Sequence, residues 1–215
     1  MGHQREKLIS LAKRLLNHNL NGSTDQADQI MIKKVNDYID DDIISSEVSK
    51  IFYDHPVPIA LSAELKKKNS YKATKAIDTP LLITRGEDGV VRTFINICKH
   101  RGAPVCPEGR GEKSKFNCTY HGWMYDNKGS LVNIFKSDTF GDIDTKNIKL
   151  TELFCEEKSG FIWACLNPDI KYNLSDWMNE FETELDDIGL KNWYIFKSTT
   201  LNLSLIHISE PTRRY

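Results

Sequence analysis

CKHRGAP, residues 98–104, and CTYHGW, residues 118–123, are the two stretches that decide how this chain folds and what chemistry it carries. The first holds the C-x-H pair Cys98 and His100, and the second holds the C-x-x-H pair Cys118 and His121. A mixed-ligand [2Fe–2S] cluster needs this inventory, because one of its irons is bound by two Cys and the other by two His. Each stretch would then give one ligand to each iron. The spacing therefore predicts that these four residues bind such a cluster.

The ligand types also predict what the centre does. Two neutral imidazoles in place of two anionic thiolates remove negative charge from the cluster and raise its reduction potential. Gly102 and Gly122 follow the ligands, and glycine lets the backbone come close enough for N–H groups to point at the sulfides. The pattern is typical of a centre that passes single electrons.

Two other interpretations use the same residues. A Cys₂His₂ zinc site also has two thiolates and two imidazoles, but its usual order is C-x₂₋₄-C followed by H-x₃₋₅-H. A lone Cys or His at the end of a strand is more often packed than ligating. The interleaved order and the paired occurrence favour the iron–sulfur interpretation.

Two of the three remaining cysteines, Cys155 and Cys165, are predicted to be structural. Five cysteines without a secretory context make a disulfide framework improbable. Cys155 and Cys165 lie in apolar runs, where a thiol behaves as a small core residue. Cys106 is interpreted as a thiol of the first loop.

Composition excludes several classes of protein. Lys plus Arg (29) balance Asp plus Glu (30) over 215 residues, and the run Lys66–Lys68 is too short for a nucleic-acid surface. No segment approaches the roughly 18 continuous apolar residues of a membrane span. We expect a soluble, cytoplasmic protein with no nucleic-acid or membrane partner.

Hydrophobic periodicity predicts a mainly β fold between helices. Helical spacing indicates one helix around Leu8–Leu16 and a weaker one over residues 25–40. From about residue 70, short β-rich runs alternate with turns such as those ending at Gly89 and Gly129, which predicts antiparallel hairpins. The predicted strands are 71–77, 81–84, 90–97, 123–125 and 131–134.

Four parts are expected along the chain. They are a helical segment (1–50), the β domain (51–168), a connecting helix over 174–185 with the first strand of a further domain near 193–201 (together 169–202), and a tail (203–215). The tail resembles a translated sequencing adapter, since one choice of codons reproduces the adapter over residues 203–213. His207 therefore receives no functional role.

The ligand stretches, continued by MYD at 124–126, resemble the N-terminal domain of Rieske non-haem iron oxygenase large (alpha) subunits, the aromatic-ring-hydroxylating oxygenases. The similarity extends over roughly residues 38–202. Respiratory-chain Rieske proteins share the ligand pairs but add two cysteines that form a disulfide. Ala103 and Tyr120 hold those places here, so the oxygenase branch fits better.

The resemblance implies a Rieske [2Fe–2S] domain of antiparallel sheets, with Cys98, His100, Cys118 and His121 as ligands. An α+β catalytic domain would follow, of which the chain carries only the start. The complete enzyme would take NAD(P)H-derived electrons from a ferredoxin or a flavin reductase. It would pass them to a mononuclear Fe(II) that activates O₂ and hydroxylates an aromatic or other organic substrate.

That second iron would sit in a 2-His-1-carboxylate triad, for which the chain offers no candidate, so no catalytic residue is assigned. The fragment alone is expected to lack oxygenase activity. Large subunits of this kind commonly form homotrimers or α₃β₃ assemblies. The alternative is a stand-alone Rieske ferredoxin-like electron carrier.

Overall fold

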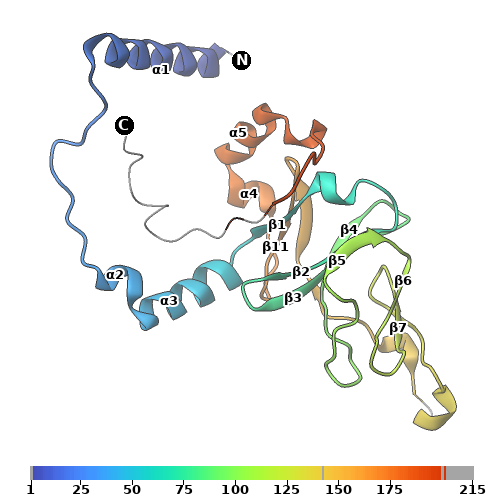
Figure 1. Ribbon diagram of the computed structural model, residues 1–215. Coiled ribbons are helices and arrows are strands. Elements are labelled where there is room, and N and C mark those ends of the chain that lie inside the picture. The colour runs from blue at the N-terminus through green and yellow to red at the C-terminus, as the bar shows by residue number, and fades with distance from the viewer. Residues whose placement is uncertain (1, 142, 200, 202–215) are drawn as a thin grey trace. The chain divides into compact units, whose positions relative to one another are not determined.

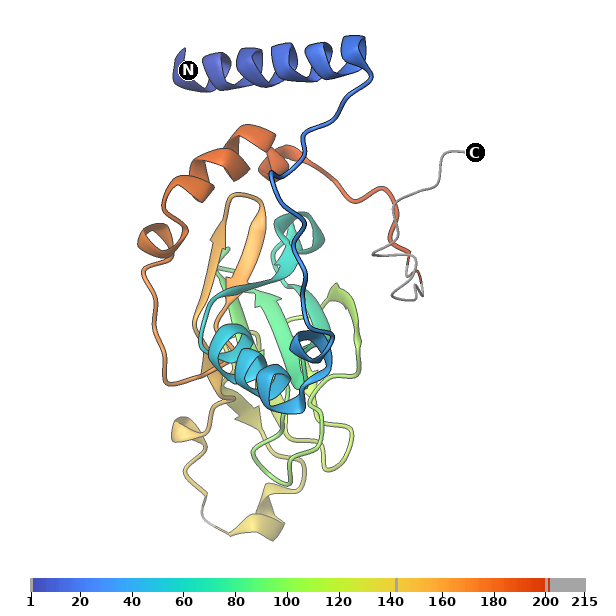
Figure 2. The same ribbon diagram turned by 90° about the vertical axis from the view of Figure 1, so that its left-hand side faces the viewer.

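The structure is a computed structural model that describes residues 2–141, 143–199 and 201 (Figure 1, Figure 2). It divides into two compact units, residues 1–44 and 45–215. The predicted adapter-derived tail, residues 203–215, lies outside the described residues.

The first unit is helical only in part. Helix α1 (Gly2–Asn21) confirms the helix predicted around Leu8–Leu16. The helix predicted over residues 25–40 is wrong, because only α2 (Asn36–Ile39) is helical in that range. Ile30, Met31 and Ile32 remain exposed there. A short helix without a packed apolar face is marginal in water, which explains the missing turns.

The second unit is built from three sheets, with strand orders β5-β2-β3-β4-β9, β1-β11-β10 and β6-β7-β8. Every pairing within them is antiparallel, which confirms the predicted fold class. The sheet β6-β7-β8 lies at the end of the unit opposite to α4 and α5 (Figure 1, Figure 2). The strands are β1 (Val57–Leu61), β2 (Ser70–Ala76), β3 (Thr79–Arg85), β4 (Val91–Ile95), β5 (Gly109–Glu112), β6 (Lys115–Asn117), β7 (Met124–Asp126), β8 (Leu131–Asn133), β9 (Glu152–Leu153), β10 (Cys155–Lys158) and β11 (Phe161–Ala164).

The remaining elements are helical. They are α3 (Asp41–Glu47), the π-helix η1 (Val48–Tyr53), the 3₁₀ turns η2 (Ser62–Leu65), η3 (Ser137–Phe140), η4 (Thr145–Asn147) and η5 (Leu190–Asn192), and the helices α4 (Leu174–Met178) and α5 (Glu180–Ile188). None of the described helices is long and apolar enough to cross a bilayer.

Tight turns set the register of the hairpins. The β3–β4 and β7–β8 turns contain Gly89 and Gly129, both with positive φ, as predicted. The β10–β11 hairpin turns at Ser159 and Gly160, whose φ values of 52° and 86° suit a two-residue type I′ loop. These turns fix which residues of neighbouring strands face each other within each sheet.

One core cluster joins the five-stranded sheet to the β6-β7-β8 sheet. Leu82 and Phe94 of the first meet Phe116 and Tyr125 of the second. Cys98, Cys106 and Cys118 belong to the same buried cluster. The two ligand loops therefore begin inside the core, which holds their first residues in fixed positions.

The helix predicted over 174–185 is divided in two. Asn179 has a φ of 48° and separates α4 from α5. Asn tolerates positive φ better than most residues, because its short polar side chain can bond locally. Leu174, Met178 and Leu185 still pack against Trp163, so the predicted apolar face is correct at these positions.

The strand predicted near residues 193–201 is absent from the part of this range that is described, 193–199 and 201. A strand needs a hydrogen-bonding neighbour. None of the described strands pairs with this segment.

Candidate metal centre

Two loops carry the four predicted ligands, and the same pair of backbone hydrogen bonds closes each loop. The first loop follows β4, and the second joins β6 to β7. In each, the cysteine N–H donates to the carbonyl five residues on, and the N–H four residues on donates to the cysteine carbonyl. These bonds are Cys98 N to Ala103 O (2.8 Å), Gly102 N to Cys98 O (3.0 Å), Cys118 N to Trp123 O (2.9 Å) and Gly122 N to Cys118 O (2.9 Å).

Glycine is required at the end of each loop. Gly102 and Gly122 have φ values of 75° and 68°, a region that disfavours residues with a Cβ. A Cβ at Gly122 would also lie 2.8 Å from the Phe135 Cβ. Within this shared frame the histidine stands two residues after Cys98 but three residues after Cys118.

The two thiols lie together in the core. Cys98 is 2% exposed and Cys118 is 3% exposed. Burial raises the pKa of the Cys98 thiol, the adjacent Cys118 raises it further, and hydrogen bonds from Tyr125 and from the His100 backbone oppose this rise. Burial therefore favours the protonated form of the Cys98 thiol, whose proton a metal ion would have to displace.

The two imidazoles of the loops form a second pair. The ring centroids of His100 and His121 are 4.6 Å apart, with planes at 71°. The Nδ1 atoms of both rings are buried and have no hydrogen-bond partner in the described part of the chain. Burial, His121 and Arg101 lower the pKa of His100, which favours the neutral imidazole that a metal ligand must be.

Aromatic side chains fix the orientation of both rings. Trp123 stacks on His100 with centroids 5.0 Å apart and planes at 8°. The Phe140 ring meets the His100 ring edge-on, with centroids 5.3 Å apart, and the ring centroids of Tyr120 and His121 are 3.8 Å apart. These contacts limit each imidazole to a small range of angles.

The donor set fits a two-iron cluster. Buried polar atoms are normally paired, so two orphaned Nδ1 atoms side by side indicate a ligand. Among residues 2–141, 143–199 and 201, no three His, Cys, Asp or Glu side chains converge on one ion. Each iron of a mixed-ligand [2Fe–2S] cluster is bound by only two protein ligands, whereas a structural tetrahedral zinc ion is bound by four.

Tyr125 is a site residue that the sequence prediction missed. Its hydroxyl lies 3.4 Å from the Cys98 sulfur and accepts a hydrogen bond from the Lys99 N–H at 3.1 Å. Burial and the two neighbouring thiols raise its pKa far above the usual value, so it remains a donor. The alternation of Trp123 and Tyr125 at i and i+2 was the available signal, since such residues share one face of a strand.

The other cysteines are structural. Cys106 lies in the first loop but is 1% exposed, and burial raises its pKa. Cys165 is fully buried, as predicted, and burial raises the pKa of the partly buried Cys155 to about 11. All five thiols are free of disulfides.

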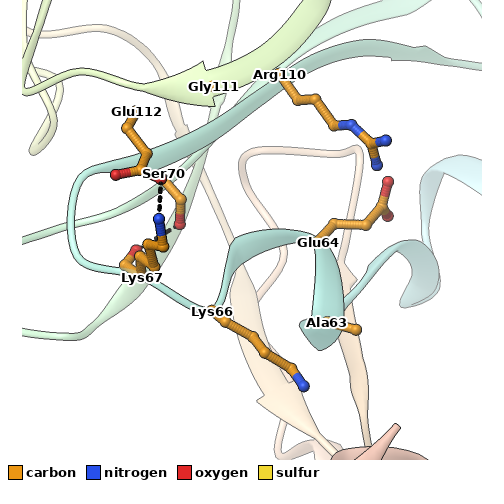
Figure 3. A pocket seen from close by; sticks show the side chains of 8 residues that line it. All are labelled: Ala63, Glu64, Lys66, Lys67, Ser70, Arg110, Gly111 and Glu112. Atoms are coloured by element: carbon orange, nitrogen blue, oxygen red, sulfur yellow. Dashed lines mark hydrogen bonds and ion pairs between the residues drawn. The ribbon is translucent and has the colours of Figure 1, made fainter. Parts of the chain in front are cut away.

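A separate hollow of about 360 Å³ lies between η2 and β5 (Figure 3). In its wall, Lys67 is bonded to Glu112 at 2.7 Å, and the Arg110 side chain points toward Glu64, which pairs with Lys72 at 2.8 Å. None of its lining residues belongs to the two ligand loops. The hollow is thus distinct from the candidate metal centre.

Comparison with known proteins agrees with this geometry. Residues 55–147 match the family described as "Rieske [2Fe-2S] domain", and the match includes both loops. This chain contains a Rieske domain. Its cofactor is accordingly a Rieske-type [2Fe–2S] cluster.

The Rieske domain is similar to those of oxygenase alpha subunits. The chain is 36% identical over 119 residues to the anthranilate 1,2-dioxygenase large subunit of Burkholderia cepacia, covering 52% of this chain and 28% of that protein. It is 34% identical over 155 residues to the methanesulfonate monooxygenase hydroxylase subunit alpha of Methylosulfonomonas methylovora, covering 66% and 37%.

A solved structure shows the same similarity. The quaternary ammonium Rieske monooxygenase CntA, in complex with L-carnitine, superposes with a TM-score of 0.65 at 29% identity, covering 71% of this chain and 43% of that one. The chain spans less than two fifths of the length of the two curated relatives.

Proposed function

We propose that Cys98 and Cys118 bind one iron of the cluster, that His100 and His121 bind the other through Nδ1, and that the domain passes single electrons. The observation that carries the assignment is that the same two loops bear two buried thiols and two imidazoles in mutual contact, whose Nδ1 atoms are buried without a partner in the described part of the chain. A Rieske cluster, when bound, takes up and gives off one electron at a time at a potential raised by its imidazole ligands.

The residues around the ligands shape this electron transfer. The core cluster shields both cysteines from water, whereas His100 and His121 are only partly buried. Electrons would therefore enter and leave on the imidazole side. When Cys98 binds iron its sulfur carries no proton, so the Tyr125 hydroxyl at 3.4 Å would donate to it and stabilise the more negative, reduced state.

The whole protein would be a Rieske oxygenase alpha subunit. The names of the similar proteins support this class, and the chain aligns with part of the length of each. In the complete enzyme, electrons from a ferredoxin or a flavin reductase would cross this domain to a mononuclear iron in a further domain. Oxidation of an organic substrate by O₂ and assembly as a homotrimer or α₃β₃ belong to the same proposal.

The ligand set is tested on the purified chain by absorption and electron paramagnetic resonance spectra, with iron and acid-labile sulfide analysis. We expect equal iron and sulfide, a red-brown colour, and a signal of low average g-value after dithionite. His100→Cys and His121→Cys should retain a cluster but lower its potential strongly, because a thiolate adds negative charge. Cys155→Ser, the matched control, lies in β10 outside both ligand loops and should leave the potential unchanged. A colourless protein with zinc and no sulfide would refute the assignment.

The oxygenase assignment needs a separate test. Sequencing the gene beyond codon 202 should reveal a reading frame that encodes a 2-His-1-carboxylate triad. A stop codon at that point would instead leave a Rieske electron carrier.

A further inference from the structure

Asn96 is a buried polar residue that the proposed electron transfer does not yet use. It lies between β4 and the first ligand loop, two residues before Cys98, and is 3% exposed. A buried amide is costly unless its donors and acceptor are paired. The hydrogen-bond partners of the Asn96 side chain therefore show which part of the chain it stabilises.

The Asn96 side chain binds the far end of the first loop through three hydrogen bonds. Its Oδ1 accepts from the N–H groups of Val105 and Cys106, each at 3.1 Å. Its Nδ2 donates to the Cys106 carbonyl at 2.7 Å. Two donors face one end of the amide and an acceptor faces the other, so only asparagine in one orientation satisfies all three.

The second loop has no need of such a clamp. Its two ends run into paired strands, since Phe116 faces Tyr125 and Asn117 faces Met124 between β6 and β7. The first loop leaves β4, but the strand that follows it, β5, pairs with β2. The far end of the first loop therefore forms no strand pairing with β4. The side-chain amide of Asn96 supplies the hydrogen bonds that such a pairing would provide.

The main chain of Asn96 is anchored as well. Its N–H donates to the Pro80 carbonyl of β3 at 2.8 Å. The anchor connects the far end of the loop, through one side chain, to the central strands of the five-stranded sheet. Cys98 and His100 lie between the two fixed ends.

We propose that Asn96 is the positioning residue of the cluster: it fixes Cys98 and His100 relative to Cys118 and His121. This inference rests on the proposed ligand set. Rigid placement of the first loop keeps the geometry of both irons uniform from molecule to molecule. Without the clamp, residues 98–106 would sample several positions, and the cluster would have a spread of environments.

The test compares Asn96→Ala and Asn96→Asp with Asn167→Ala, all in the intact chain carrying its cluster. Asn167 is a matched control, because it also braces a loop, donating to Asp54 at 2.9 Å and accepting from the Asp169 N–H, but outside the ligand loops. Asn96→Asp retains an oxygen that can accept from the N–H groups of Val105 and Cys106, but it loses the N–H that donates to the Cys106 carbonyl. It should fold even if the alanine variant does not.

Hydrogen exchange and paramagnetic resonance are measured together. In Asn96→Ala, and to a smaller extent in Asn96→Asp, exchange at residues 98–106 should rise roughly tenfold while residues 118–123 stay protected. The resonance lines should broaden and the reduction potential should shift, whereas Asn167→Ala should change neither.

Unchanged exchange at residues 98–106 would refute the clamp. Faster exchange with an unaltered spectrum and potential would show that Asn96 only stabilises the fold. A wild-type chain without a cluster would instead refute the ligand set.

Discussion

The indole of Trp123 lies nearly parallel to the imidazole of His100, with planes at 8° and ring centroids 5.0 Å apart. Trp123 is the last residue of the second ligand loop, whereas His100 belongs to the first, so this stack connects the two loops. Trp123→Phe should keep an aromatic face, and Trp123→Leu should remove it. We expect the leucine variant alone to alter the nitrogen hyperfine couplings of the histidine ligands, measured by pulsed paramagnetic resonance. Identical couplings in all three proteins would contradict a role for the stack.

Tyr125→Phe should lower the reduction potential. The hydroxyl that approaches the Cys98 sulfur stabilises the reduced state, and a hydrogen bond worth about 1 kcal/mol corresponds to a few tens of millivolts for one electron. Potentiometry at neutral pH measures the change. Tyr71→Phe changes another ring of the same core without touching Cys98, and its potential should remain that of the wild type. A Tyr125→Phe potential equal to or above wild type would contradict the hydrogen bond.

Ile77→Gly should stabilise the fold. Ile77 has a φ of 53° in the two-residue β2–β3 turn and is 43% exposed. A β-branched residue in this region is strained by about 1–2 kcal/mol, part of which the flexibility of glycine in the unfolded chain offsets. Urea denaturation should show a gain of roughly 1 kcal/mol. The neighbouring change Asp78→Gly should give no gain, because Asp78 has no positive φ to relieve.

Glu157 should make stability depend on pH. Burial alone would raise its pKa, but the Arg85 guanidinium, bonded to both carboxylate oxygens at 2.9 and 2.6 Å, lowers it below the usual value. A lowered pKa gives stability that is present above about pH 4.3 and is lost as the pH falls through the folded value.

The Tm of wild type should therefore fall more steeply below pH 4 than the Tm of Glu157→Gln. Glu112→Gln is the control, since Glu112 pairs with Lys67 in an exposed position where ion pairs contribute little. Parallel Tm curves for wild type and Glu157→Gln would contradict this account.

The sequence predicted the antiparallel sheets and both hairpin glycines, because a two-residue alternation and a required positive φ are local properties. It did not predict which helical patterns lack a packing surface in the fold and therefore do not form helices. Residues 25–40 carry a weak helical period but no packed face, and the turn at Asn179 depends on a backbone conformation that periodicity does not encode.

The candidate site shows the same division. The four ligand positions follow from spacing, although their role as ligands stays a prediction. Tyr125 and Asn96 act across the fold, on Cys98 and Cys106 respectively, and such contacts exist only once strands are paired. Cys106 was assigned to a loop correctly, but its burial depends on that same packing.

The unpartnered Nδ1 atoms of His100 and His121 have a consequence for the life of the chain in a cell. Each buried polar atom without a partner costs about 1–3 kcal/mol, against a total folding stability of only about 5–15 kcal/mol. On the proposed ligand set, binding of the cluster gives both atoms a partner, so the loaded chain would be the more stable form. Loading of the cluster would then lower the fraction of unfolded copies that proteases can attack.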